Sequence, residues 1–138
     1  MKLKVLVIPQ SIYGVNLRNK LGKAWRDYRL KILKQYQFKC VYCHFYSPSN
    51  HAHENWTICH NTRTSTLKEV VCVCRRCHMC IHILFALHLH KQGKLNLETI
   101  IQHFCKVNNC NRDAWHDAVK NAQAEQQMCK DYVYWVGF

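Results

Sequence analysis

Apolar residues recur at helical spacing in the first third of the chain. Four of them lie three or four positions apart, namely Trp25, Tyr28, Ile32 and Tyr36, and Leu33 follows Ile32 directly. This spacing predicts an amphipathic helix over residues 24–38, with its apolar face packed on the rest of the protein. The β-branched run at residues 2–8 predicts a strand or an extended segment that ends at Pro9.

The centre of the chain has the pattern of a β-hairpin followed by a helix. Residues 51–58 and 67–73 are the predicted strands, and the second is rich in β-branched side chains, which suit a buried strand. Alternation along the first strand places His51, His53 and Asn55 on one face and Glu54 on the other. A helix is predicted from residue 79 to about 90.

The last third is predicted to be helical, with two segments and a short tail. An apolar stripe runs along the first segment: Leu97, Ile100, Ile101, Phe104 and Val107. A second helix follows to residue 129, and residues 132–136 are predicted to dock as a strand or an extended cover. The fold class is therefore α+β, with a small ββα core between an N-terminal basic helix and a C-terminal helical pair.

We expect one compact unit with three parts. Residues 1–39 form the basic N-terminal strand and helix segment, residues 40–92 form the ββα module, and residues 93–138 form the C-terminal helical extension. A chain of this length can bury about two-thirds of its unfolded surface and so can form a core.

The net charge is +12, from 20 Lys and Arg against 8 Asp and Glu. Residues 1–39 hold ten basic residues and one acidic residue, so this segment alone contributes +9. Such a field suits a polyanion such as DNA. The candidate phosphate-binding residues are Lys23, Arg26, Lys31, Lys34, Arg75 and Arg76. The alternative is a basic face that meets only solvent.

The 10 cysteines have the spacing of a metal site. The apolar run at the N-terminus is too short for a signal peptide, and no run is long enough to span a membrane, so we expect a cytoplasmic, reducing compartment and no membrane partner. In that compartment metal binding is favoured over disulfides. Two Cys-x-x-Cys pairs offer four thiolates for a structural zinc ion: Cys40, Cys43, Cys74 and Cys77.

His78 and His82 follow the second cysteine pair at a spacing that places both on one face of a helix. The chain begins this region with a first cysteine knuckle (Cys40–Cys43), a strand with His53-Glu54-x-Trp56 and a returning strand. A second knuckle (Cys74–Cys77) and a helix with the two histidines follow. This order resembles the HNH endonuclease family, a ββα-metal nuclease with a zinc knuckle. The resemblance is greatest to a subgroup whose first strand has the His-Glu-x-Trp sequence.

The resemblance implies a metal-dependent endonuclease that hydrolyses DNA, here expected to be duplex DNA. A catalytic divalent ion (Mg²⁺, Mn²⁺, Ni²⁺ or Zn²⁺) would be held by His53, His78 and His82, and a strand residue would take a proton from water. The strand allows two alignments. In one, His53 is the base and the strand ligand is missing. In the preferred one, His53 is a ligand and Glu54 is the base.

Two other functions are compatible with the sequence. An inactive protein of the same fold could bind nucleic acid without cutting it, which the atypical strand motif favours. A phage or mobile-element factor could instead use the scaffold against a protein complex of a bacterial host. Nothing in the sequence selects that protein partner or an oligomeric state.

Overall fold

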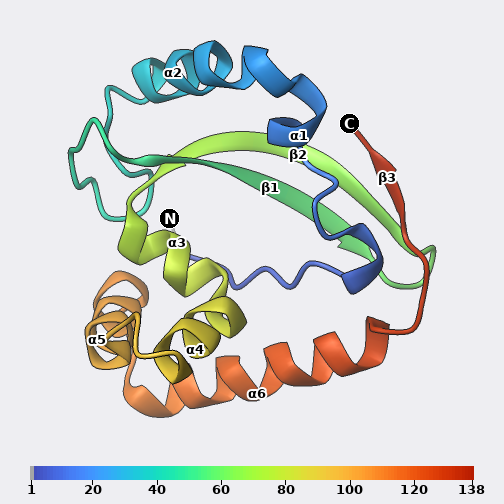
Figure 1. Ribbon diagram of the computed structural model, residues 1–138. Helices are drawn as coiled ribbons and strands as arrows, with labels where there is room; N and C mark the ends of the chain where they lie inside the picture. The colour runs from blue at the N-terminus through green and yellow to red at the C-terminus, as the bar shows by residue number, and fades with distance from the viewer. Residues whose placement is uncertain (1) are drawn as a thin grey trace.

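A twisted antiparallel hairpin lies at the centre of the molecule in the computed structural model, which describes residues 2–138 (Figure 1). Strand β1 (His51–Cys59) pairs with β2 (Thr64–Val73), from His51 opposite Val73 to Cys59 opposite Thr64. The short β3 (Trp135–Gly137) adds in parallel to the start of β2, giving the order β1-β2-β3. Together with the helices, this sheet confirms the α+β class.

The hairpin contains one irregularity next to the histidine-bearing half of β1. Asn55 lies opposite Glu69, but the next residue, Trp56, lies opposite Leu67, so Lys68 has no partner in the ladder. An extra residue of this kind is a β-bulge, which increases the local twist of a hairpin.

The chain before the hairpin crosses from one side of the sheet to the other. Residues 2–9 are extended but form no strand, and the Leu6 amide donates to the Ile81 carbonyl at 2.9 Å. Short helical turns follow: η1 (Gln10–Ile12), α1 (Leu17–Leu21) and η2 (Gly22–Ala24). The Asn16 side chain caps α1 by accepting a hydrogen bond from the Asn19 amide.

Helix α2 (Trp25–Gln35) packs Ile32 and Leu33 against the hairpin on the face opposite α3 (Figure 1). It ends three residues before the predicted end at Phe38. Gln37 and Phe38 have φ angles of 54° and 59°, a left-handed conformation that cannot continue an α-helix. This turn leads the chain directly into the first cysteine pair.

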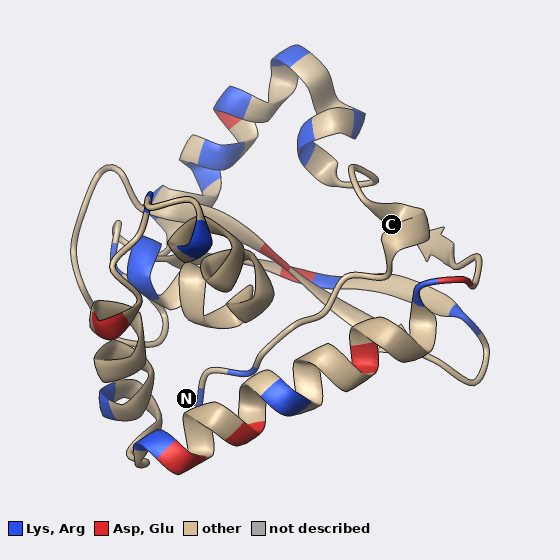
Figure 2. Cartoon of the chain, turned by 60° about the horizontal axis from the view of Figure 1, so that its bottom comes forward, with Lys and Arg blue, Asp and Glu red and all other residues tan. Residues whose placement is uncertain are grey.

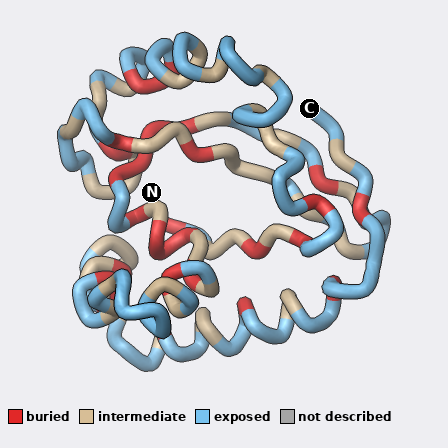
Figure 3. Tube along the Cα trace, in the orientation of Figure 1, coloured by how far each residue is buried: buried red, intermediate tan, exposed pale blue. Residues whose placement is uncertain are grey.

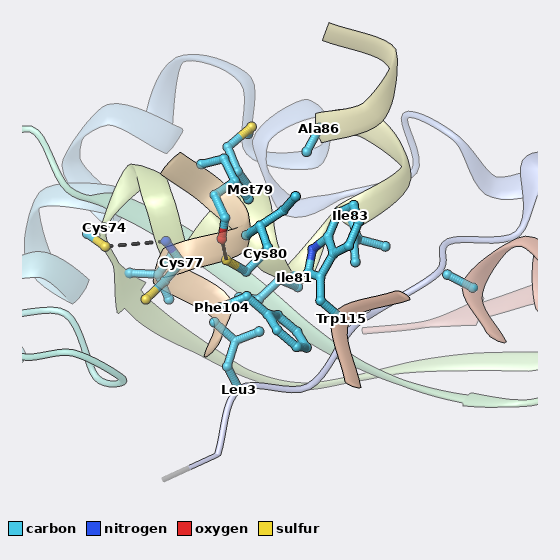
Figure 4. Close-up of a cluster of buried hydrophobic side chains, with 14 of the residues drawn as sticks. Leu3, Cys74, Cys77, Met79, Cys80, Ile81, Ile83, Ala86, Phe104 and Trp115 are labelled. Atoms are coloured by element: carbon cyan, nitrogen blue, oxygen red, sulfur yellow. Dashed lines mark hydrogen bonds between the residues drawn. The ribbon is translucent and has the colours of Figure 1, made fainter. Parts of the chain in front are cut away.

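The helix predicted from residue 79 to about 90 is two helices. Helix α3 (Arg75–Ile81) begins four residues earlier, and α4 (Ile83–Lys91) follows after a break at His82, where φ is −96° and ψ is 60°. The early start has a local cause, because the Cys74 sulfur accepts a hydrogen bond from the Cys77 amide at 3.4 Å and so caps the helix (Figure 4).

The two predicted C-terminal helices are present. Helix α5 (Leu97–Asn108) is capped by Asn96, and α6 (Arg112–Cys129) is capped by Asn111. They pack below α3 and α4, and one cluster of buried side chains draws on all three predicted segments (Figures 3 and 4). Its members include Leu3, Val71, Ile81, Ile100, Phe104 and Trp115.

Basic side chains gather on the N-terminal helices, while α6 mixes both signs of charge (Figure 2). Four of the predicted phosphate-binding residues lie exposed on η2 and α2: Lys23, Arg26, Lys31 and Lys34. Within residues 2–138, no helix has both the length and the apolar character needed to cross a membrane.

Candidate metal centres

Four cysteines meet where the two knuckles come together beside the hairpin. The ligand atoms of Cys40, Cys43, Cys74 and Cys77 all lie within 4.8 Å of one another. The sulfur atoms of Cys43 and Cys74 are 3.5 Å apart. With Zn–S bonds of about 2.3 Å, tetrahedral geometry places sulfur atoms about 3.8 Å apart. The cluster could therefore hold a zinc ion through the four cysteines that the spacing predicted.

Backbone hydrogen bonds form the first knuckle. The His44 amide donates to the Cys40 carbonyl at 2.8 Å, and the Cys40 amide donates to the Phe45 carbonyl at 2.9 Å. His44 adopts a left-handed conformation with φ 64°, which completes the tight turn. The Val41 amide donates to the Cys72 carbonyl at 2.9 Å and so joins the knuckle to β2.

The crowding of these sulfur atoms makes a cation at their centre electrostatically favourable. Hydrogen bonds from Cys74 and Cys77 lower the pKa of Cys40, so one thiolate forms readily. The bond with Cys40 in turn raises the pKa of Cys74 to about 12 and raises that of Cys77. A second thiolate is therefore disfavoured unless a metal ion is present to offset the repulsion.

His103 contacts this cluster and was not predicted. Its Nε2 atom lies 3.1 Å from the Cys77 sulfur, and it comes from α5 in the C-terminal extension. Hydrogen bonds from outside the ligand set orient metal ligands and stabilise their charge. The sequence held one signal, because His103 lies about one turn after the buried Ile100 on the predicted helix.

A second group joins β1 to α3. One ring nitrogen each of His53, His78 and His82 lies within 4.8 Å of the others. The ring centroids are 5.1 Å apart for His53 and His78, 5.3 Å for His53 and His82, and 5.0 Å for His78 and His82. The His82 amide donates to the His78 carbonyl at 3.0 Å, which keeps helical spacing despite the break.

The three imidazoles are poised in the neutral form that binds metals. His53 is 2% exposed, and its Nε2 atom has no hydrogen-bond partner among the described residues. Burial lowers the pKa of His53 to about 3 and that of His78 to about 2. Burial also lowers the pKa of His82, partly offset by a hydrogen bond with the Leu6 backbone. A metal ion bound through Nε2 would satisfy this otherwise unpaired nitrogen of His53.

His51 extends this histidine cluster toward solvent. Its Nδ1 lies 2.8 Å from Nδ1 of His78, and the residue is half-buried. Burial is the largest cause that lowers the pKa of His51, and the charges of Arg29 and Arg75 lower it further. Arg29, whose charge acts on His51 together with that of Arg75, was not among the predicted phosphate-binding residues.

Arg76 is exposed on α3, directly after Arg75. Its charge is the next cause, after burial, that lowers the pKa of His103 on α5. Neighbouring residues on a helix point about 100° apart, so the two arginines leave α3 in different directions.

The structure places Glu54, the residue preferred as general base, apart from the histidine cluster. Its carboxylate accepts a hydrogen bond from the Leu17 amide at 2.7 Å, at the start of α1. It therefore lies on the face of β1 turned away from His53, as strand alternation requires. Burial raises its pKa and the Leu17 hydrogen bond opposes that shift, and the carboxylate stabilises the N-terminus of α1.

The predicted phosphate-binding residues fall on two sides of the hairpin. Lys23, Arg26, Lys31 and Lys34 accompany α2, on the side opposite α3 and the histidine cluster (Figures 1 and 2). Arg29 is the α2 residue that reaches round, donating to the Asn50 carbonyl at 2.6 Å.

Comparisons with known proteins identify no relative. A scan of protein-family models, a search of curated proteins and a search of solved structures each found no match.

Replacing a cluster cysteine should remove zinc. We expect Cys40→Ser to lose one equivalent of bound zinc and to unfold at much lower denaturant concentration, because the ion links two loops that the chain alone holds weakly. Elemental analysis of the purified protein and urea unfolding followed by circular dichroism would measure both effects. Cys59→Ser is the matched control, since Cys59 is exposed and outside the cluster. Full zinc retention by Cys40→Ser would refute the assignment.

Removing the His103 hydrogen bond should weaken zinc binding without abolishing it. His103→Ala is expected to raise the zinc dissociation constant about 10- to 100-fold, the usual cost of losing an outer partner of a metal ligand. Competition with a chromophoric chelator measures the constant. His116→Ala, an exposed histidine on α6, should leave it unchanged. Equal constants for His103→Ala and the unaltered protein would show that the contact does not act on the metal.

Proposed function

We propose that the protein is an HNH-like, metal-dependent endonuclease that hydrolyses DNA, with structural zinc in the four-cysteine cluster and a catalytic divalent ion at His53, His78 and His82. The observation that carries the proposal is the meeting of these three imidazoles between β1 and α3. The buried, unpaired Nε2 of His53 is the strongest single support, since an orphaned buried nitrogen is costly without a partner.

The residues around the cluster suit phosphodiester hydrolysis. A divalent ion at the histidines would supply charge stabilisation to the leaving oxygen. Arg75, beside His51, would hold a phosphate oxygen through its guanidinium group. His78 would bind the ion through its Nε2, so its Nδ1 would keep its proton and donate it to the Nδ1 of His51. His51 would thereby orient the His78 ring toward the ion.

The charge of the chain supports a polyanionic substrate. The net charge is +12, and exposed basic residues line α2 across the hairpin from the histidine cluster. A substrate that met both surfaces would have to pass the end of the sheet where Arg29 holds Asn50. DNA is long enough to do this, whereas a small phosphate ester is not.

A second function is favoured by the position of Glu54. With this carboxylate committed to α1, the site holds imidazoles but no acid, and the protein could bind nucleic acid without cutting it. The same experiment separates the two functions, because binding would persist where cleavage is absent.

Cleavage of supercoiled plasmid with added Mg²⁺, Mn²⁺, Ni²⁺ or Zn²⁺, or with none, tests the proposal. We expect metal-dependent nicking or linearisation that falls by more than about 100-fold in His53→Ala, since losing even an outer partner of a ligand costs 10- to 100-fold. Gel densitometry measures the rate.

His88→Ala is the matched control, since His88 is an exposed histidine on α4. Zinc content and circular dichroism must show that His53→Ala is folded. Cleavage by His53→Ala at the unaltered rate would exclude this site. DNA binding without cleavage under every metal would select the second function.

The two knuckle arginines should differ in cleavage. Arg75→Ala is expected to lower the cleavage rate about tenfold, as loss of one charged hydrogen bond would. Arg76→Ala should have a smaller effect, although it removes the same charge. The measurement is the plasmid cleavage rate at several salt concentrations. Equal losses in both variants would mean that the arginines act only through net charge.

A further inference from the structure

Two large aromatic side chains stand exposed on the first knuckle. Phe45 and Tyr46 are each 59% exposed, directly after Cys43 and His44. The neighbouring Cys40 is fully buried in the zinc cluster. Phe is among the residue types most often buried, and Tyr is intermediate.

We call residues 43–46 the aromatic turn. Backbone hydrogen bonds make this turn rigid. The Phe45 carbonyl accepts from the Cys40 amide at 2.9 Å, and the Ser47 amide donates to the Phe38 carbonyl at 3.0 Å. Tyr46 pairs with Lys39 in an isolated antiparallel bridge. The rings of Phe38 and Tyr46 lie edge to face, with their centroids 6.3 Å apart. A pre-organised aromatic surface loses little entropy on binding.

Asn50 fixes the turn relative to the histidine cluster. It is 2% exposed, and its side-chain nitrogen donates to the carbonyls of Phe38 and Phe45, each at 2.9 Å. Its own carbonyl accepts from Arg29 at 2.6 Å. His51 follows Asn50 directly and opens β1. The hydrogen bonds of Asn50 therefore link the aromatic turn to the histidine cluster.

The surroundings are basic. Lys39, the bridge partner of Tyr46, is exposed. Arg29 donates to the carbonyl of Asn50, the residue before His51, and Arg75 is exposed at the start of α3. No acidic residue occurs between Asp27 and Glu54 in the sequence. A surface that combines cationic side chains with exposed rings has complementary partners for both the phosphates and the bases of a nucleic acid strand.

We propose that Phe45 and Tyr46 form a stacking platform for unpaired DNA bases, next to the histidine cluster. The proposal deepens the nuclease function and rests on it for the identity of the polymer. It narrows the substrate to single-stranded DNA or DNA with locally unpaired bases, because a ring can stack only on a base whose face is free.

Binding of fluorescent oligonucleotides, followed by anisotropy without an added catalytic metal, tests the platform. The probes are a single strand, an abasic sugar–phosphate strand of equal length, and the matching duplex. We expect the single strand to bind about tenfold tighter than the abasic strand, the range that stacking of one base supplies. The double variant Phe45→Ala/Tyr46→Ala should lose that difference and keep its affinity for the abasic strand.

Tyr13→Ala is the matched control, since Tyr13 is 57% exposed but lies outside the knuckle. Zinc content of the double variant must match that of the unaltered protein. Equal affinity of the unaltered protein for the single and abasic strands would overturn the proposal. The proposal would also be overturned if the double variant lost as much affinity for the duplex as for the single strand.

The outcome is separable from that of the nuclease proposal. Base-dependent binding without plasmid cleavage would retain the platform and reject the nuclease. Cleavage without base dependence would retain the nuclease and reject the platform.

Discussion

The contact among four cysteine sulfur atoms is the constraint on which the rest of the structure depends. Cys40 and Cys43 follow α2, whereas Cys74 and Cys77 open α3, so a shared ion would close a loop around the entire hairpin. The same atoms organise their neighbours: the Cys74 sulfur caps α3, and the Cys77 sulfur contacts His103 on α5. Zinc would thus tie the hairpin, the first knuckle and the C-terminal extension together, and without it the thiols oppose one another's ionisation.

The histidine cluster depends on that closure. His78 directly follows Cys77, and His82 lies at the break just after α3, so the position of the second knuckle sets both rings against β1. His53 meets them from the strand with its Nε2 unpaired. A strand, the helix that Cys74 caps and the break at the end of that helix therefore present the three donors. Such placement on rigid elements is what a precise metal site requires.

The sequence predicted whatever depended on spacing and periodicity. The two Cys-x-x-Cys pairs, the His78 and His82 pair, and the C-terminal helices each follow from a local rule, and each is present. Roles that depend on contacts between distant segments of the chain could not be predicted from spacing or periodicity. Alternation correctly separated Glu54 from His53, but only the fold brings Leu17 to the Glu54 carboxylate. The contacts of His103 and Arg29 are likewise long-range, and the break at His82 has no glycine or proline to mark it.

The hydrogen bonds of Asn50 connect the proposed base-stacking turn with the histidine cluster. Its side chain holds the aromatic turn, its carbonyl holds Arg29 from α2, and its successor His51 contacts His78. Basic helix, aromatic turn and histidine cluster thus meet at one buried amide. If the rings engage bases, they would also fix which phosphate arrives at the metal, because the spacing between turn and cluster is set by hydrogen bonds rather than by a flexible loop.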